Sequence, residues 1–314
     1  MRPTCVNKVF DLAQRDPRVV YIGSDLSPDL TARMKQEMPG RAFMEGVSEA
    51  HVVGMAAGLA MEGFIPFVHT IATFITRRCY EQVAVDLCLH NLPVRLIGNG
   101  GGLVYAPLGP THLAIEDIAI MRALPNMTVV AVCDADEMVR FMDQTVDWPG
   151  PIYIRLAKGF DPIVSRADLG FEIGKAIPMR LAGPSRNRVL LVSTGVATTR
   201  ALAAADLLEA KSVECTVLHV HTVKPLDSTA VLDHSRDMRA VVTIEEHTVV
   251  GGLGSAVTDV LVDGQGPPPL IRRLGIPDVF AAKYGSQDQL MAMYGLQPPQ
   301  IAGSVWDALK LVSA

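Results

Sequence analysis

One acidic residue stands where an apolar helix is expected to begin. Glu49 follows Val47-Ser48 and precedes small and apolar residues that predict a helix from near Ala50 to a stop at Gly63. A carboxylate at a helix start is most often a partner of the helix dipole. This helix is so apolar that the Glu49 carboxyl group should be at least partly buried, and a buried carboxylate needs a partner or a proton. An acid that shares a proton with a ligand nitrogen is one solution.

Other candidate residues lie in loops that follow predicted strands. Asp25 comes just after a β-branched strand at 19–23, at the carboxyl end where open α/β sheets place ligands, and a plain turn or cap aspartate fits equally well. His112 lies in a later loop, where a lone histidine is more often structural. Gly100–Gly102 follow a strand at 94–98 and indicate a backbone that a ligand approaches closely.

Composition excludes several classes of protein. Net charge is −5 and gives no basic footprint for nucleic acid. No apolar run reaches the roughly 18 residues that a membrane span needs, and no signal peptide is visible at the start. The 5 cysteines show no CxxC spacing, which argues against zinc and against a disulfide framework and favours a cytoplasmic location. Hydrophobic content of 49% with 19% charged residues predicts a large protein–protein interface.

Strand and helix patterns alternate along the chain and predict two α/β domains. The first, residues 1–160, is expected to be a doubly wound parallel sheet. Residues 161–187 contain repeated glycine and proline and are expected to be a linker. A second doubly wound unit fills residues 188–314, with strands at 188–193, 215–219 and 240–244.

The stretch from Gly46 to Thr70, GVSEAHVVGMAAGLAMEGFIPFVHT, resembles the pyrimidine-binding signature of the transketolase family of thiamine-diphosphate enzymes. HTVKPLD, TIEEH and GGLGS are similar to that family's C-terminal domain. The resemblance extends over nearly all 314 residues. It implies the C-terminal half of a transketolase encoded as a separate subunit, with a parallel-sheet pyrimidine-binding domain followed by a mixed-sheet C-terminal domain.

The resemblance implies roles in binding thiamine diphosphate for Asp25, Glu49, Ile71, Phe74 and Arg78. Glu49 matches the acid that hydrogen-bonds the pyrimidine nitrogen N1′ and exchanges a proton with it. Phe74 matches an aromatic residue that stacks on the pyrimidine, and aliphatic Ile71 stands where a second aromatic is common. Asp25 matches an aspartate that approaches the cofactor from its pyrimidine side.

Among the positions where the family binds its substrate, some residues of this sequence match the family pattern and others differ from it. His112, in Gly109-x-Thr111-His112, matches a catalytic histidine that contacts the two-carbon unit, and Arg2 matches a phosphate-binding arginine. The departures from the family pattern are Asp29 for a serine, Gly100 for a histidine, Leu108 for an acid and Lys158 for an arginine. Polar contacts for a phosphorylated polyol are thereby depleted, and we expect an unusual sugar substrate.

Half of the cofactor site is missing from the sequence. The family grips the diphosphate and its Mg²⁺ or Ca²⁺ through a GDG motif, and the DG at Asp263-Gly264 does not supply one. We expect no metal ligands here, and an N-terminal subunit that holds the metal in an α2β2 assembly. The implied reaction passes a two-carbon ketol unit from a ketose to an aldehyde. The β subunit of a 2-oxoacid dehydrogenase and a non-catalytic scaffold remain alternatives.

Overall fold

The computed structural model describes all residues except 25, 27, 158, 160, 265, 313 and 314. The side chains of residues 28–30 and 312 are also outside the described part. The predicted cofactor residue Asp25 and the predicted substrate residue Lys158 therefore lie outside the described residues. So does the side chain of Asp29. Within the described part of the chain, no helix combines the length and the apolar composition that crossing a membrane requires.

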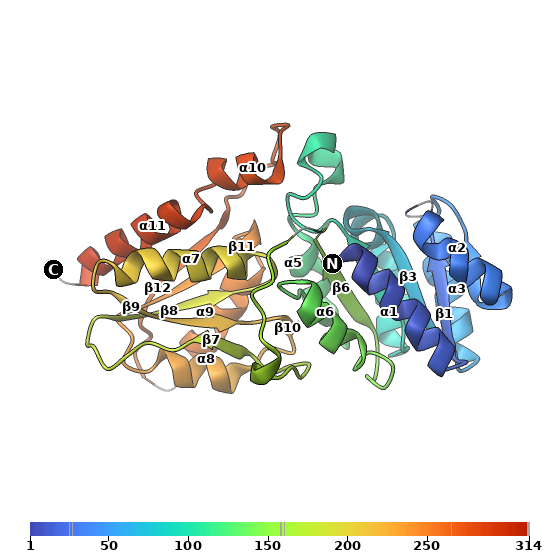
Figure 1. Cartoon of the computed structure of the whole chain (residues 1–314), viewed down its shortest axis with the longest axis horizontal. Coiled ribbons are helices and arrows are strands. Elements are labelled where there is room, and N and C mark those ends of the chain that lie inside the picture. Colours follow the sequence, from blue (N-terminus) through green and yellow to red (C-terminus); the bar gives the residue numbers. More distant parts are fainter. Residues whose placement is uncertain (25, 27, 158, 160, 265, 313–314) are drawn as a thin grey trace.

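Two sheets lie side by side, one in each half of the chain (Figure 1). The first has the strand order β10-β5-β6-β4-β3-β1-β2. Its strands from the first half of the chain are all parallel, so their carboxyl ends share one edge. They are β1 (Val19–Gly23), β2 (Ala42–Met44), β3 (Ile65–Ile71), β4 (Arg95–Asn99), β5 (Thr128–Val130) and β6 (Ile152–Leu156).

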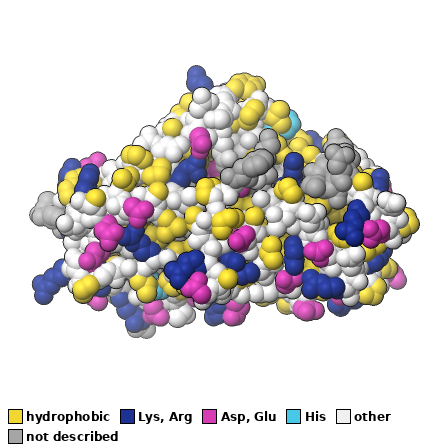
Figure 2. Space-filling model, viewed as in Figure 1, with side chains coloured by type: hydrophobic (Ala, Val, Ile, Leu, Met, Phe, Trp, Pro, Cys, Tyr) yellow, Lys and Arg dark blue, Asp and Glu magenta, His cyan; other side chains and the backbone are white. Residues whose placement is uncertain are grey.

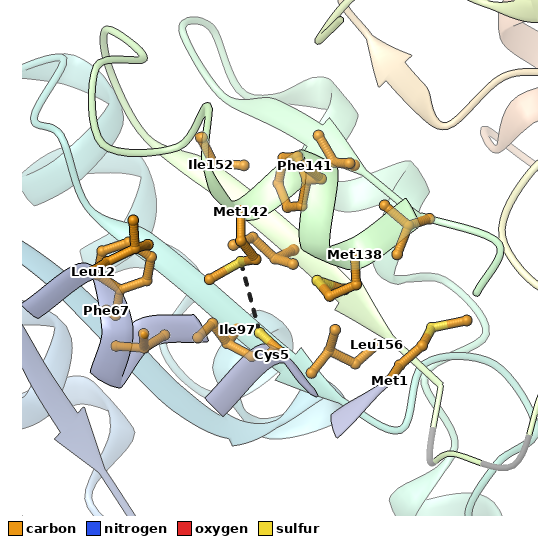
Figure 3. Packing of buried hydrophobic residues seen from close by; sticks show 14 of the residues in the cluster. Met1, Cys5, Leu12, Phe67, Ile97, Met138, Phe141, Met142, Ile152 and Leu156 are labelled. Carbon is orange, nitrogen blue, oxygen red and sulfur yellow. Dashed lines mark hydrogen bonds between the residues drawn. The ribbon is translucent and has the colours of Figure 1, made fainter. Parts of the chain in front are cut away.

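Helices cover both faces of the first sheet. They are α1 (Arg2–Arg15), α2 (Pro28–Glu37), α3 (Glu49–Met61), α4 (Tyr80–Gln82), α5 (Asp117–Ala123) and α6 (Ala135–Met142). On one face α1 and α6 pack on β3, β4 and β6, with Cys5 of α1 against Met142 of α6 (Figure 3). The other face buries α3 and a π-helical region made of Phe74–Arg78 and Val83–Leu89. π-Helical turns are rare and occur mostly within α-helices, so the sequence alone does not distinguish this region from an ordinary helix.

The second sheet has the order β12-β11-β8-β9-β7. Its strands are β7 (Ile177–Arg180), β8 (Arg188–Ser193), β9 (Glu214–His219), β11 (Ala240–Thr248) and β12 (Leu270–Ile276). The helices α7 (Ala197–Glu209) and α11 (Pro298–Val312) cover one face, and α8 (Ser228–Ser235) and α9 (Leu253–Asp263) cover the other. The antiparallel edge strand β7 lies within the range 161–187 that was expected to be a linker.

The predicted fold class is confirmed, because the first sheet is dominated by parallel strands and the second is mixed. One strand of the second unit also joins the sheet of the first. Strand β10 (Thr222–Lys224) belongs to the second half of the chain but pairs antiparallel with β5 at the edge of the first sheet. The motif HTVKPLD therefore builds the junction between the two units. The helix α10 (Gln287–Met293) lies next to the loop after β4 at the top of Figure 1.

Candidate active site

Glu49 is the first residue of α3 and is 3% exposed. Its Oε2 accepts a hydrogen bond from Nη1 of Arg78 at 2.8 Å. Its Oε1 lies 3.4 Å from the donating hydroxyl of Thr70 at the end of β3. The partner that a buried carboxylate needs is therefore a guanidinium from the π-helical region, with the amides of the helix start adding a favourable dipole.

Phe74 connects Arg78 to His112. The guanidinium carbon of Arg78 lies 4.0 Å from the centroid of the Phe74 ring, within cation–π range. The His112 ring meets Phe74 edge to face at 5.3 Å between centroids. Four residues that the sequence singled out thus form one continuous group from three elements. Ile71, the last residue of β3, is half-buried just before this group.

Arg77, which was not among the residues expected from the sequence, fixes the loop that carries His112. Its Nε lies 3.0 Å from Oε1 of Glu116, and its Nη2 donates to the carbonyl of Thr111 at 3.3 Å. Adjacent arginines of one π-helical turn therefore serve different partners, Arg78 the buried carboxylate and Arg77 the loop. The two adjacent arginines that follow Phe74 were the sequence feature from which a role for Arg77 could have been predicted.

The glycine run after β4 is packed by the chain itself. A Cβ at Gly100, where φ is +76°, would lie 2.1 Å from the Tyr105 ring. Added Cβ atoms at Gly101 and Gly102 would collide with Arg155 and Glu246. Close packing within the chain is enough to require glycine at these positions, and the approach of a ligand to their backbone stays a prediction. Gly100, predicted to face substrate, is buried under Tyr105.

Arg2 and Leu108, the other predicted substrate residues, lie in different surroundings. Arg2 begins α1 and is half-buried. Burial raises the pKa of Tyr105, and the charge of the nearby Arg2 opposes that shift. Leu108 is 50% exposed on the loop after β4. The ring of Tyr284 packs against the neighbouring Gly109.

A buried network ties this loop to the second sheet. Oδ2 of Asp117, at the start of α5, accepts from Arg155 Nε and from the Tyr153 hydroxyl, both at 2.7 Å. Arg155 also donates to the backbone carbonyl of Glu246 on β11 at 2.9 Å. The Glu246 carboxylate accepts from the amide of Leu103 at 2.8 Å. Glu246 therefore lies at an interface, and that interface joins the two halves of this chain.

One group of described residues, Cys133, Glu137 and His219, has three potential metal-ligand atoms close together. Nε2 of His219 lies 2.9 Å from Oε2 of Glu137 across the domain junction. Burial alone would raise the pKa of Glu137, but the charge and hydrogen bond of His219 lower it to about 2. Burial, and then the charge of Glu137, raise the pKa of the Cys133 thiol well above its usual range. Because Glu137 and His219 already pair with each other, we interpret this group as an interdomain hydrogen bond.

Family models match both halves of the chain: the transketolase pyrimidine binding domain over residues 4–160 and the transketolase C-terminal domain over residues 182–301. A similar protein is the 6-deoxy-6-sulfo-D-fructose transketolase subunit of Clostridium sp. (strain MSTE9), 37% identical over 96% of this chain and 92% of that protein. A 1-deoxy-D-xylulose-5-phosphate synthase of Synechococcus sp. is 35% identical over 96% of this chain but only 47% of its own length.

A solved structure described as a split gene transketolase, an inactive β4 tetramer, superposes with a TM-score of 0.88. The two sequences are 34% identical, and the superposition covers 99% of this chain and 98% of the other chain. The Clostridium protein, which matches over nearly its whole length, is described as a subunit, whereas this chain matches only about half of the length of the synthase.

Proposed function

Because this chain belongs to the transketolase family, we propose that it supplies the pyrimidine-binding half of a thiamine-diphosphate-dependent transketolase built from two kinds of subunit. The proposed reaction moves a two-carbon ketol unit from a ketose donor to an aldehyde acceptor. The observation that carries the proposal is the continuous group Glu49, Arg78, Phe74 and His112, which joins a buried carboxylate to an aromatic face and an imidazole.

The residues present fit the pyrimidine part of the cofactor. A planar aminopyrimidine needs an aromatic face and a carboxyl group that can exchange a proton with a ring nitrogen, and Phe74 and Glu49 offer these. When bound, thiamine diphosphate supplies the carbanion chemistry that breaks and forms the carbon–carbon bond. Ile71 at the end of β3 is a half-buried aliphatic side chain that comes three residues before Phe74 in the chain.

In the proposed mechanism each side chain keeps one task. Glu49 holds the pyrimidine nitrogen and passes a proton to and from it. Arg78 neutralises Glu49 between these transfers, since its guanidinium is already in place. Thr111 Oγ1 lies 2.9 Å from Nδ1 of His112 and fixes the imidazole, so Nε2 is the atom that donates to an oxygen of the two-carbon unit. Asp25 remains a proposed neighbour of the cofactor.

The partner supplies what this sequence lacks. Without a GDG motif, the diphosphate and its Mg²⁺ or Ca²⁺ fall to an N-terminal subunit, and α2β2 is the proposed assembly. A similar chain that is described as inactive as a β4 tetramer supports this division. Leu108, Phe280 and Tyr284 are among the exposed large apolar side chains. Figure 2 shows apolar side chains lying between charged ones on one face of the molecule. Such a surface suits contact with another subunit.

The proposed substrate is a sugar outside ordinary pentose phosphates. Gly100, Leu108 and Asp29 stand where the family's phosphorylated-polyol contacts are expected, and Tyr105 fills the space above Gly100. A similar subunit is named for 6-deoxy-6-sulfo-D-fructose, so variation at the sugar's far end exists among its relatives. Normal turnover of xylulose 5-phosphate with ribose 5-phosphate would contradict this part of the proposal.

Calorimetry with thiamine diphosphate and Mg²⁺ tests the proposal directly. We expect no binding to this chain alone and binding to its mixture with the subunit encoded beside it. Tight binding to this chain alone would contradict the division of the site. If the mixture assembles but does not bind, the scaffold alternative is favoured. Decarboxylation of 2-oxoacids in place of ketol transfer would favour the dehydrogenase alternative.

A further inference from the structure

A segment of the second half of the chain packs on the loop that carries His112. The segment is residues 280–297, which we call the α10 segment, and the loop is residues 103–115, between β4 and α5. Figure 1 shows α10 beside this loop. Ile71 of the candidate active site packs against an apolar cluster that both of them build. Its buried members include Leu103, Ala106 and Leu113 from the loop and Ala281, Leu290 and Met291 from the α10 segment.

One buried carboxyl group joins the α10 segment to the start of the loop. Oε1 of Glu246 accepts hydrogen bonds from the amide of Leu103 and from Nε2 of Gln287, each at 2.8 Å. Glu246 is 2% exposed, so either donor could leave only at the cost of a buried, unpaired group. Asp288 beside Gln287 pairs with Arg200 of α7. The α10 segment is therefore fixed both to the loop and to its own half of the chain.

Tyr284 of the α10 segment covers the residue from which the His112 turn begins. Gly109 has a φ of +79° and lies between two short 3₁₀ turns, Ala106–Leu108 and Pro110–His112. Its carbonyl accepts a hydrogen bond from the amide of His112 at 3.0 Å. A Cβ at position 109 would lie 2.6 Å from the Tyr284 ring. The ring thus lies on the Gly109 backbone and limits the conformational freedom that glycine otherwise has.

Two contacts from the first half of the chain also reach this turn. Nη2 of Arg77 donates to the carbonyl of Thr111 at 3.3 Å, and the Phe74 ring meets the His112 ring edge to face at 5.3 Å. Both contacts lie after Gly109 in the chain, so a rotation of the Gly109 backbone would change their distances. The Tyr284 ring acts at the residue where that rotation would take place.

We propose that Tyr284 is a positioning residue for His112, through which the second half of the chain sets the place of the imidazole in the active site. Tyr284 acts through the backbone, because its ring packs on Gly109 and the Gly109 carbonyl holds the amide of His112. The Tyr284 side chain is 70% exposed, so it adds little to the buried core. This inference rests on the proposed function, because the task of His112 is part of that function.

NMR of the histidine rings in the full chain alone tests the proposal without cofactor or partner. The chain has 8 histidines, and in a sample with ¹³C-labelled histidine the ring signal that disappears in His112→Gln belongs to His112. In Tyr284→Ala we expect this signal to move or to split, because Gly109 then adopts more than one conformation. Tyr284→Phe keeps the ring that packs on Gly109 and should leave the His112 signal in place.

Phe280→Ala is the matched control for this NMR measurement, because it removes an aromatic ring of the same segment that is 82% exposed. It should leave the His112 signal unchanged. The urea midpoint of Tyr284→Ala should equal that of the wild type, since the lost ring lies mostly in solvent. An unchanged His112 signal in Tyr284→Ala, or the same change in Phe280→Ala, would overturn the proposal. So would a clearly lowered midpoint in Tyr284→Ala, because it would show a general structural role.

Kinetics of the complex with saturating partner subunit supply a second measurement. Tyr284→Ala should lower kcat about 10- to 100-fold, as expected for a displaced catalytic group, and leave the affinity for thiamine diphosphate unchanged. Tyr284→Phe should have the kcat of the wild type. Equal kcat in Tyr284→Ala and the wild type would overturn the proposal. A wild-type complex without ketol transfer would contradict the proposed function instead, and the NMR measurement on the chain alone would still decide whether Tyr284 positions His112.

Discussion

Glu49 is buried, yet it lies beside a guanidinium that remains partly in solvent. The Arg78 side chain is 44% exposed, whereas that of Glu49 is 3% exposed. The desolvation cost of the pair therefore falls mostly on the carboxylate, and the arginine offsets it without being fully buried itself. A carboxylate held in this way stays next to the Phe74 face, where the proposed chemistry needs it.

Replacement of Glu49 by glutamine should abolish turnover and leave the protein assembled. Glutamine has the same shape, but it cannot exchange a proton with a ligand nitrogen. General acid–base groups contribute about 10²- to 10⁴-fold, so we expect a loss of that size in kcat of the reconstituted complex. Sedimentation of the complex is the control, because the assembly should be unchanged. Activity within tenfold of the wild type would contradict the role of Glu49.

Arg78→Met tests whether the ion pair stabilises the fold. Methionine keeps an apolar contact with Phe74 but leaves the Glu49 carboxylate without its cation. We expect a loss of about 1–3 kcal/mol in the free energy of unfolding, measured with urea at pH 7. In a Glu49→Gln background the same substitution should cost much less. An equal loss in both backgrounds would show that Arg78 acts through packing alone.

At the scale of residues, the sequence predicted which side chains gather but not how they are paired. Glu49, Phe74 and His112 could be placed because a family pattern fixes their spacing. The ion pair of Glu49 with Arg78 depends on a π-helical turn. The sequence does not distinguish such a rare turn from an ordinary helix. Arg77 was missed for the same reason.

The loop between β4 and α5 is the element that positions His112, and its anchor is Arg155. This buried arginine bonds Asp117 at the start of α5, the carbonyl of Ala114 in the loop and the carbonyl of Glu246 on β11. A single guanidinium thus closes one end of the loop and joins it to the second sheet. Its planar set of donors matches three acceptors that a lysine could not reach together.

Arg155→Met should destabilise the chain strongly, because the buried Asp117 carboxylate would lose its cation and keep only the hydrogen bond from the Tyr153 hydroxyl. Removing one member of a buried ion pair typically costs about 3–5 kcal/mol, and we expect a loss of that order in urea unfolding at pH 7. Arg166→Met is the matched control, since Arg166 pairs with Asp168 on the surface. Exposed pairs contribute about 1 kcal/mol or less. Equal effects of the two variants would contradict the anchoring role.

Elements were predicted where local pattern and tertiary context agree. The β-branched runs at 19–23 and 188–193 became β1 and β8 with the expected bounds. The run Gly100–Gly102 does not by itself identify what approaches it, because glycine marks any close approach, and Tyr105, Arg155 and Glu246 all pack against it. Strand β10 could not be assigned to the first sheet from its sequence, because its partner β5 is distant in the chain.

Across the whole molecule, buried neutral histidines make stability depend on pH. Burial lowers the pKa of His69 and of His221 from 6.5 to about 4. The unfolded chain therefore binds protons that the folded chain does not, and stability is lost as pH falls from about 6.5 through 4. We expect urea midpoints to fall between pH 7 and 4.5, and to fall less in His221→Phe. A drop of the same size in that variant would contradict the contribution of His221.

The two halves of the chain should unfold together, because the contacts between them are buried and varied. Strand β10 completes the first sheet, the amide of Leu103 donates to Glu246, and Glu137 meets His219 at 2.9 Å. None of these can be broken without exposing polar groups that have lost their partners.

The two tryptophans of the chain allow a direct measurement of this coupling. Trp148 lies in the first half and donates to Thr128 of β5, and Trp306 lies on α11 of the second half. In Trp306→Phe the remaining Trp148 reports on unfolding of the first half, and in Trp148→Phe the remaining Trp306 reports on the second half. We expect the two fluorescence transitions in urea to coincide, because each half needs groups supplied by the other. If Glu137→Ala separates the midpoints of the two transitions, the buried contact with His219 is part of that coupling. Separate midpoints without the Glu137→Ala substitution would show that the halves are independent domains.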